Sequence, residues 1–171
     1  MSLSAGARSA LTVLVLVLLL LAALLWGWTA VTAPLPTSTA PTEKCVPTEV
    51  EKGSTVRPGQ VVVSVLNASS REGLAGRTMQ LFEDDGYVAG SSGNAPSSTR
   101  VAKAQIWAPN PDDPSVQLVR SRLGRGTKVV DTPTTAPGVV VVVGDRFRDL
   151  AEGRKAVRVE EDTTICSPPE G

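Results

Sequence analysis

The chain has 171 residues, and its 17 basic and 17 acidic side chains cancel to a formal net charge of zero. With this balance and no basic stripe interleaved with aromatic residues, nucleic acid is not an expected partner. Histidine is absent, which excludes Ser-His-Asp and Cys-His catalytic arrangements and removes the commonest metal ligand.

An apolar run near the N-terminus predicts one transmembrane helix over residues 11–30, preceded by a cytoplasmic N-terminus, residues 1–10. Leu11–Trp28 is almost wholly apolar and approaches the roughly 20 residues that cross a hydrocarbon core. Arg8 before the run favours a cytoplasmic N-terminus. A cleaved secretory signal is the alternative, but the run is longer than usual for one and Pro34 follows the small residues of the cleavage position. Both interpretations place the chain after residue 34 outside the cytoplasm.

Composition then divides the extracytoplasmic part. Residues 31–59 are rich in Pro and Thr and are predicted to form a flexible tether. The α/β domain proper is expected at 60–150, and 151–171 form a C-terminal extension. The folded part as a whole is expected from about Val46 to about Ile165, which is enough for one hydrophobic core.

Two cysteines, Cys45 and Cys166, bracket this folded part. A disulfide persists outside the cytoplasm, and the ends of a domain often lie close together. An internal disulfide is therefore the favoured prediction. Two free thiols or an intermolecular link are the alternatives.

The fold is indicated most strongly by residues 61–93. Val61–Leu66 is an apolar, largely β-branched run that predicts a buried strand. A polar turn follows, and Gly73–Asp85 has the 3.6-residue period of an amphipathic helix. Tyr87–Ala89 then resumes an extended run. Together they predict a right-handed βαβ unit.

Further elements complete one small α/β domain. Strands are predicted at 104–108, 127–131 and 138–144, with a helix running from Asp113-Pro114 to Leu123. The order is therefore β-α-β-β-α-β-β, a mixed sheet of about five strands preceded by the transmembrane helix. The Ser- and Gly-rich segment Gly90–Arg100 is expected to be a mobile loop.

These motifs, in this order, resemble the LytR C-terminal domain family. They are the strand-Leu-Asn turn and helix within Val65–Gly90, then Gly93-Asn94-Ala95, then Gly144-Asp145-Arg146-Phe147. Domains of this family often follow a LytR/CpsA/Psr phosphotransferase domain in Gram-positive envelope proteins, and others follow only a membrane anchor. The chain leaves no room for the phosphotransferase domain, so its glycopolymer ligation activity is not expected. Ser69-Ser70-Arg71-Glu72 departs from the glycine-bearing turn of relatives.

A ligand site is predicted at the turn after the first strand, because the carboxyl ends of strands and the N-termini of helices favour ligands, especially anions. The ligand would be a sugar, a phosphate of an envelope polymer or a peptide carboxylate. The alternative is that Asn67 and Ser70 only cap the helix and complete the turn. The candidate residues, from the turn and from the end of the last strand, are Asn67, Ser69, Ser70, Arg71, Gly73, Asp145 and Arg146.

The function expected from this organisation is that of a non-enzymatic accessory protein in the bacterial cell membrane. It would bind peptidoglycan, wall glycopolymer or envelope-assembly proteins and tune wall synthesis or integrity. A protein–protein scaffold without a polymer ligand is the alternative, and a carboxylate-dependent hydrolase or transferase is a weaker one. We expect no catalytic residue or metal, because histidine is absent and the two cysteines are predicted to pair. We expect no cofactor either, since no Gly-rich loop that would bind a nucleotide is present. The oligomeric state stays open.

Overall fold

The computed structural model describes residues 13–24, 26 and 45–169, and the chain divides into two units, 1–40 and 41–171. In the first unit, the described residues are helical, and their large apolar side chains are exposed. Over the described ranges, no helix combines the length and apolarity that a membrane crossing requires. The predicted transmembrane segment, 11–30, lies partly outside these ranges, and so does the predicted tether up to residue 44.

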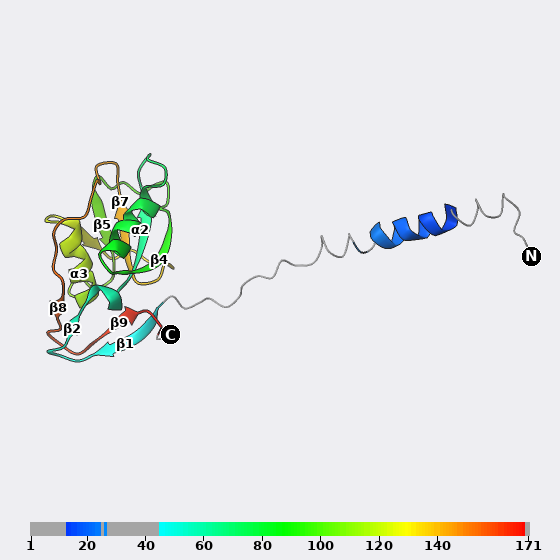
Figure 1. Ribbon diagram of the computed structural model, residues 1–171. Helices are drawn as coiled ribbons and strands as arrows, with labels where there is room; N and C mark the ends of the chain where they lie inside the picture. Colours follow the sequence, from blue (N-terminus) through cyan, green and yellow to red (C-terminus); the bar gives the residue numbers. More distant parts are fainter. Residues whose placement is uncertain (1–12, 25, 27–44, 170–171) are drawn as a thin grey trace, which may run out of the picture. The chain divides into compact units, whose positions relative to one another are not determined.

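A five-stranded mixed sheet is the framework of the second unit (Figure 1). Its strands, in spatial order, are β4 (Val88–Asn94), β3 (Val62–Asn67), β7 (Val139–Val143), β5 (Ala104–Trp107) and β6 (Lys128–Val130). β3 pairs in parallel with both β4 and β7. β5 is antiparallel to β7 but parallel to β6. The sheet therefore consists of two parallel groups that run in opposite directions and meet between β7 and β5.

Two helices, α2 (Leu74–Asp84) and α3 (Pro114–Leu123), provide the parallel crossovers from β3 to β4 and from β5 to β6. Both helices share one hydrophobic core with alternate residues of β3 and β7. A second, smaller hydrophobic cluster contains Trp107 of β5 and Val140 and Val142 of β7. The predicted small α/β domain with a mixed sheet of five strands and its element order is confirmed.

The central strand β7 is bracketed by two glycines for a steric reason. A Cβ atom at Gly138 would collide with the carbonyl of Val62, and one at Gly144 would collide with the carbonyl of Val101. Gly138 also has φ +71, a conformation that side chains disfavour. The run of valines between them is buried throughout, as a strand covered on both faces requires.

The terminal segments of the domain contribute two small antiparallel ladders that the predicted element order does not contain. β1 (Val46–Val50) pairs with β9 (Thr163–Ser167), and β2 (Thr55–Val56) pairs with β8 (Val157–Arg158). A short 3-10 helix, η1 (Pro58–Gln60), leads into β3.

Two segment assignments are corrected as a result. Residues 46–59 belong to the folded domain and not to a tether, because partners more than 100 residues away in sequence pair with their backbone. Likewise, Gly90–Arg100 is not a loop throughout, since β4 continues through Asn94 beside β3.

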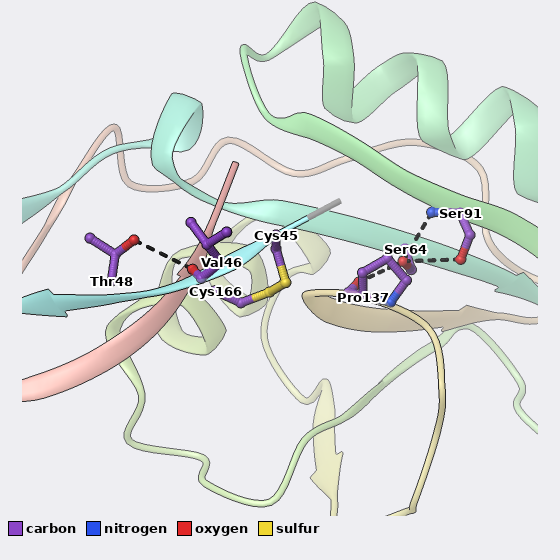
Figure 2. Close-up of a disulfide and its surroundings, with 7 residues drawn as sticks. All are labelled: Cys45, Val46, Thr48, Ser64, Ser91, Pro137 and Cys166. Carbon is purple, nitrogen blue, oxygen red and sulfur yellow. Dashed lines mark hydrogen bonds between the residues drawn. A yellow bond between two sulfur atoms is a disulfide. The ribbon is translucent and has the colours of Figure 1, made fainter. Parts of the chain in front are cut away.

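The predicted disulfide joins Cys45, just before β1, to Cys166 in β9 (Figure 2). The two Cα atoms are 5.2 Å apart and the residues are 121 positions apart in sequence. Figure 2 also shows buried Ser64 of β3, whose hydroxyl donates to the carbonyl of Pro137 at 2.6 Å. The same hydroxyl oxygen accepts the backbone N–H of Ser91 at 3.1 Å. Ser64 thus ties β3 to β4 and to the entrance of β7.

Candidate functional site

The turn between β3 and α2 is organised by Asn67, which ends β3 and is 9% exposed. Its Oδ1 accepts the backbone N–H of Ser69 at 2.9 Å and the Ser69 hydroxyl at 2.7 Å. Its Nδ2 donates to the carbonyl of Arg71 at 2.8 Å. Such side-chain bonds to nearby backbone are how Asn stabilises a turn.

Asn67 therefore completes the turn but does not cap the helix. The alternative expectation, that Asn67 caps the helix and completes the turn, is thus right about the turn and wrong about the cap. The residue at the N-cap is Gly73, which has φ +69 and no side-chain cap hydrogen bond. Gly73 is exposed at the first turn of α2. Its left-handed backbone explains why a glycine follows the turn.

The turn is fastened to the segment after β7, and we call residues 69–71 with 145–147 the clasp. Both the backbone N–H and the hydroxyl of Ser70 donate to Oδ1 of Asp145, at 3.1 and 3.0 Å. The Arg71 guanidinium donates to the carbonyl of Phe147 at 2.6 Å. Because β3 and β7 are parallel neighbours, their carboxyl ends bring these residues to one edge of the sheet.

The clasp changes what the turn offers to a ligand. The Asp145 carboxylate already accepts the Ser70 donors, and Arg71 is engaged with backbone carbonyls. An anion at this point would have to displace a carboxylate. Arg146 is exposed, and its backbone N–H donates to the carbonyl of Ala102 at 2.9 Å. Ligand binding at these residues stays a prediction.

Beside the turn lies an open hollow of about 390 Å³ at the carboxyl ends of β3 and β4. One wall is formed by the turn from Asn67 to Ser70 together with Asp145, and the other by the segment from Asn94 to Arg100. The Arg100 guanidinium donates to two carbonyls of its own loop. The hollow thus presents amide, hydroxyl and backbone groups with one acid and one base, which suits a polar ligand of low net charge.

A larger cavity, of about 490 Å³, lies at the opposite edge of the sheet. It is lined by residues that follow β5 and β6, by the start of α3, by the residues before β7 and by Cys166. Sequence reasoning missed this cavity. Its lining segments come together only because β5 and β6 run antiparallel to β3, β4 and β7. The hydrophobic pattern of the sequence does not reveal the direction of a strand.

Among the described residues, no group of three or more His, Cys, Asp or Glu side chains could hold a metal ion. One titratable group in the described part of the chain is strongly perturbed: burial raises the pKa of Tyr87 to about 12, and the neighbouring Arg122 guanidinium opposes this rise. Tyr87 lies between α2 and β4 and is not part of the clasp.

Residues 60–147, just over half of the chain, match the family described as LytR cell envelope-related transcriptional attenuator. The chain belongs to this family. The resemblance carried by the turn after β3 and by the segment after β7 is thereby confirmed. The match ends at Phe147 of the clasp, so both terminal ladders and both cysteines lie outside it.

A solved structure is also similar to this LytR C-terminal domain protein. It is the soluble domain of a conserved hypothetical secreted protein from Mycobacterium marinum, with 25% sequence identity and a TM-score of 0.49. The similarity covers 57% of this chain and 68% of that chain. No curated protein matches the chain.

Proposed function

We propose that this chain is an extracytoplasmic accessory protein of the bacterial cell envelope, which binds peptidoglycan or wall glycopolymer and tunes wall synthesis or integrity. Membership of the LytR C-terminal domain family, described as cell envelope-related, carries the proposal. The N-terminal apolar segment, residues 11–30, would hold the protein in the membrane with its N-terminus in the cytoplasm.

The disulfide supports an extracytoplasmic location for the domain. Disulfides persist in oxidising environments and are rare in the cytosol. The disulfide between Cys45 and Cys166 links the two ends of the folded domain, so its role is structural. A domain built in this way is suited to the outer side of the membrane.

The hollow beside the clasp is the surface that we propose for wall material. Its amide, hydroxyl and backbone groups are the kind that polysaccharides and peptide stems engage through hydrogen bonds. We propose no catalytic role for it. Ser70 and Asp145 bond to each other across two loops, and the chain has no histidine to activate the hydroxyl.

The test is co-sedimentation of the full chain, in mild detergent, with purified sacculi that retain or lack their attached glycopolymers. We expect binding that survives added salt, because the net charge is zero. Arg71→Ala should weaken this binding by releasing the turn from Phe147. Arg148→Ala is the matched control, since Arg148 also donates to the Phe147 carbonyl, at 3.0 Å, but lies outside the turn.

Absence of binding to either preparation would contradict the proposal and leave envelope-assembly proteins as the remaining partners. Equal loss of binding in Arg71→Ala and Arg148→Ala would place the effect in the segment after β7 and not in the turn. Retention by sacculi with glycopolymers alone would identify the polymer as the ligand.

A further inference from the structure

The cavity at the carboxyl ends of β5 and β6 is lined by a buried hydroxyl, that of Ser115. Ser115, in the first turn of α3, is 4% exposed and lines this cavity. Its Oγ has no hydrogen-bond partner among the residues that the structure describes. Buried hydroxyls are ordinarily bonded, so this one calls for an explanation.

The local structure explains why Ser115 is left unpaired. A serine within a helix usually bonds back to a carbonyl of the preceding turn, as buried Thr78 of α2 does to Leu74 at 2.9 Å. In the first turn of α3 there is no preceding helical turn. Capping does not use the hydroxyl either, since Oδ1 of Asp113 accepts the backbone N–H of Ser115 at 2.7 Å. A ligand in the cavity can supply the missing partner.

The charge of the lining narrows the class of ligand. Asp113 and Asp131 line the cavity, and none of its lining residues is Lys or Arg. The Asp113 carboxylate already satisfies the free N–H groups at the start of α3. Phosphates and carboxylates are therefore disfavoured, although a helix begins here.

The remaining lining combines an apolar wall with polar groups at its edge. Trp107, which is 8% exposed, and Val139 contribute the apolar wall, and Asn110 and Thr132 contribute polar groups. A sugar ring matches this combination, because its C–H face packs on an aromatic side chain and its hydroxyls both donate and accept. The volume of about 490 Å³ is within the range of about 300–1,000 Å³ that small-ligand sites occupy.

We infer that this cavity binds an uncharged sugar residue, which packs against Trp107 and bonds to the Ser115 hydroxyl. The inference deepens the proposed function and rests on it, because it assigns the recognition of wall polysaccharide to a second site on the domain. Anchoring of the ligand at the cavity does not involve the clasp, which lies at the other edge of the sheet.

The experiment is a fluorescence titration of the full chain carrying Trp26→Phe and Trp28→Phe, so that Trp107 is the single remaining tryptophan. The protein is held in a detergent without a sugar headgroup. The neutral probe is the trimer of N-acetylglucosamine, and N-acetylglucosamine 6-phosphate is the anionic comparison. We expect a saturable change with the neutral probe and at least tenfold weaker binding of the phosphate.

Ser115→Ala should weaken binding of the neutral probe at least tenfold while leaving the unfolding midpoint unchanged or raised, because the hydroxyl has no partner to lose. Ser121→Ala on the same helix is the matched control. Its hydroxyl bonds to the Leu118 carbonyl at 2.7 Å and it does not line the cavity, so binding should be unchanged. No saturable change, or equal binding by Ser115→Ala, would overturn the inference.

The two proposals fail in different ways. If sacculi bind the Ser115→Ala protein normally but not Arg71→Ala, the cavity inference is wrong and the proposed function stands. If the neutral probe binds in a Ser115-dependent manner and sacculi do not bind at all, the sugar site stands and the proposed function is wrong. Preference for the phosphorylated probe would also overturn the inference.

Discussion

Tyr87 offers a direct test of how the domain is packed, because it is the only tyrosine in the chain. Its ring is 4% exposed and meets Phe82 edge to face, with ring centroids 5.3 Å apart. Burial raises the pKa of Tyr87 to about 12. The Arg122 guanidinium, which pairs with Asp85 at 3.0 Å, opposes this rise but does not cancel it.

The sign of the pH dependence follows from linkage. The unfolded chain releases the phenol proton near its ordinary pKa of about 10, whereas the folded protein keeps it until about pH 12. The free energy of unfolding is therefore unaffected by Tyr87 below pH 10 and falls as the pH rises from 10 to 12. One pKa unit corresponds to about 1.4 kcal/mol, so the loss is at most about 2–3 kcal/mol.

Two measurements check this expectation. The near-ultraviolet absorbance of the phenolate reports the ionisation of Tyr87 in the folded protein. Urea unfolding at a series of alkaline pH values, compared with the Tyr87→Phe protein, isolates its contribution from those of lysines that titrate in the same range. A phenolate midpoint near 10 in the folded state, or the same alkaline slope in both proteins, would refute the reasoning.

Three further predictions concern stability. Replacing Cys45 and Cys166 by Ala should lower the free energy of urea unfolding by about 5 kcal/mol in the chain-entropy model, since the bridge closes a loop of 121 residues; a change under about 1 kcal/mol would contradict it. Asn67→Ala should cost about 1–3 kcal/mol in the same assay, because three hydrogen bonds of a buried amide are lost, and an unchanged midpoint would show that the turn holds without them. Gly76→Ala, at an exposed position of α2, should raise the thermal midpoint by adding about 0.5–1 kcal/mol, as its Cβ meets nothing within 4 Å; a lowered midpoint would point to an unseen contact.

The central elements could be predicted because their signals are local. The valine run of β7 and the change from strand to helical period between β3 and α2 are each contained within a few residues. The ends of the domain lack such signals. β1 and β9 are defined by pairing across more than 100 residues. Their sequences, VPTEV and TTICS, lack the alternation of apolar and polar residues that would distinguish a strand from a tether.

The candidate site was predictable in part for the same reason. The contact between Ser70 and Asp145 follows once β3 and β7 are parallel neighbours, since both residues come just after a strand end. The role of Asn67 was harder to foresee, because a polar residue before a helix can either cap the helix or close the turn. Gly73 decides between them, as it occupies the N-cap itself.

The opposed directions of the two crossover units have a consequence for function. β3 and β4 end at one edge of the sheet, where the clasp and its hollow lie, while β5 and β6 end at the other, where the larger cavity lies beside Cys166. β7 spans the sheet between these edges with five residues, which corresponds to a separation of about 15 Å. Sites at that distance with no shared contacts respond independently to substitution. Loss of binding in Arg71→Ala and in Ser115→Ala would therefore report two separate contacts with the envelope polymer and not one contact measured twice.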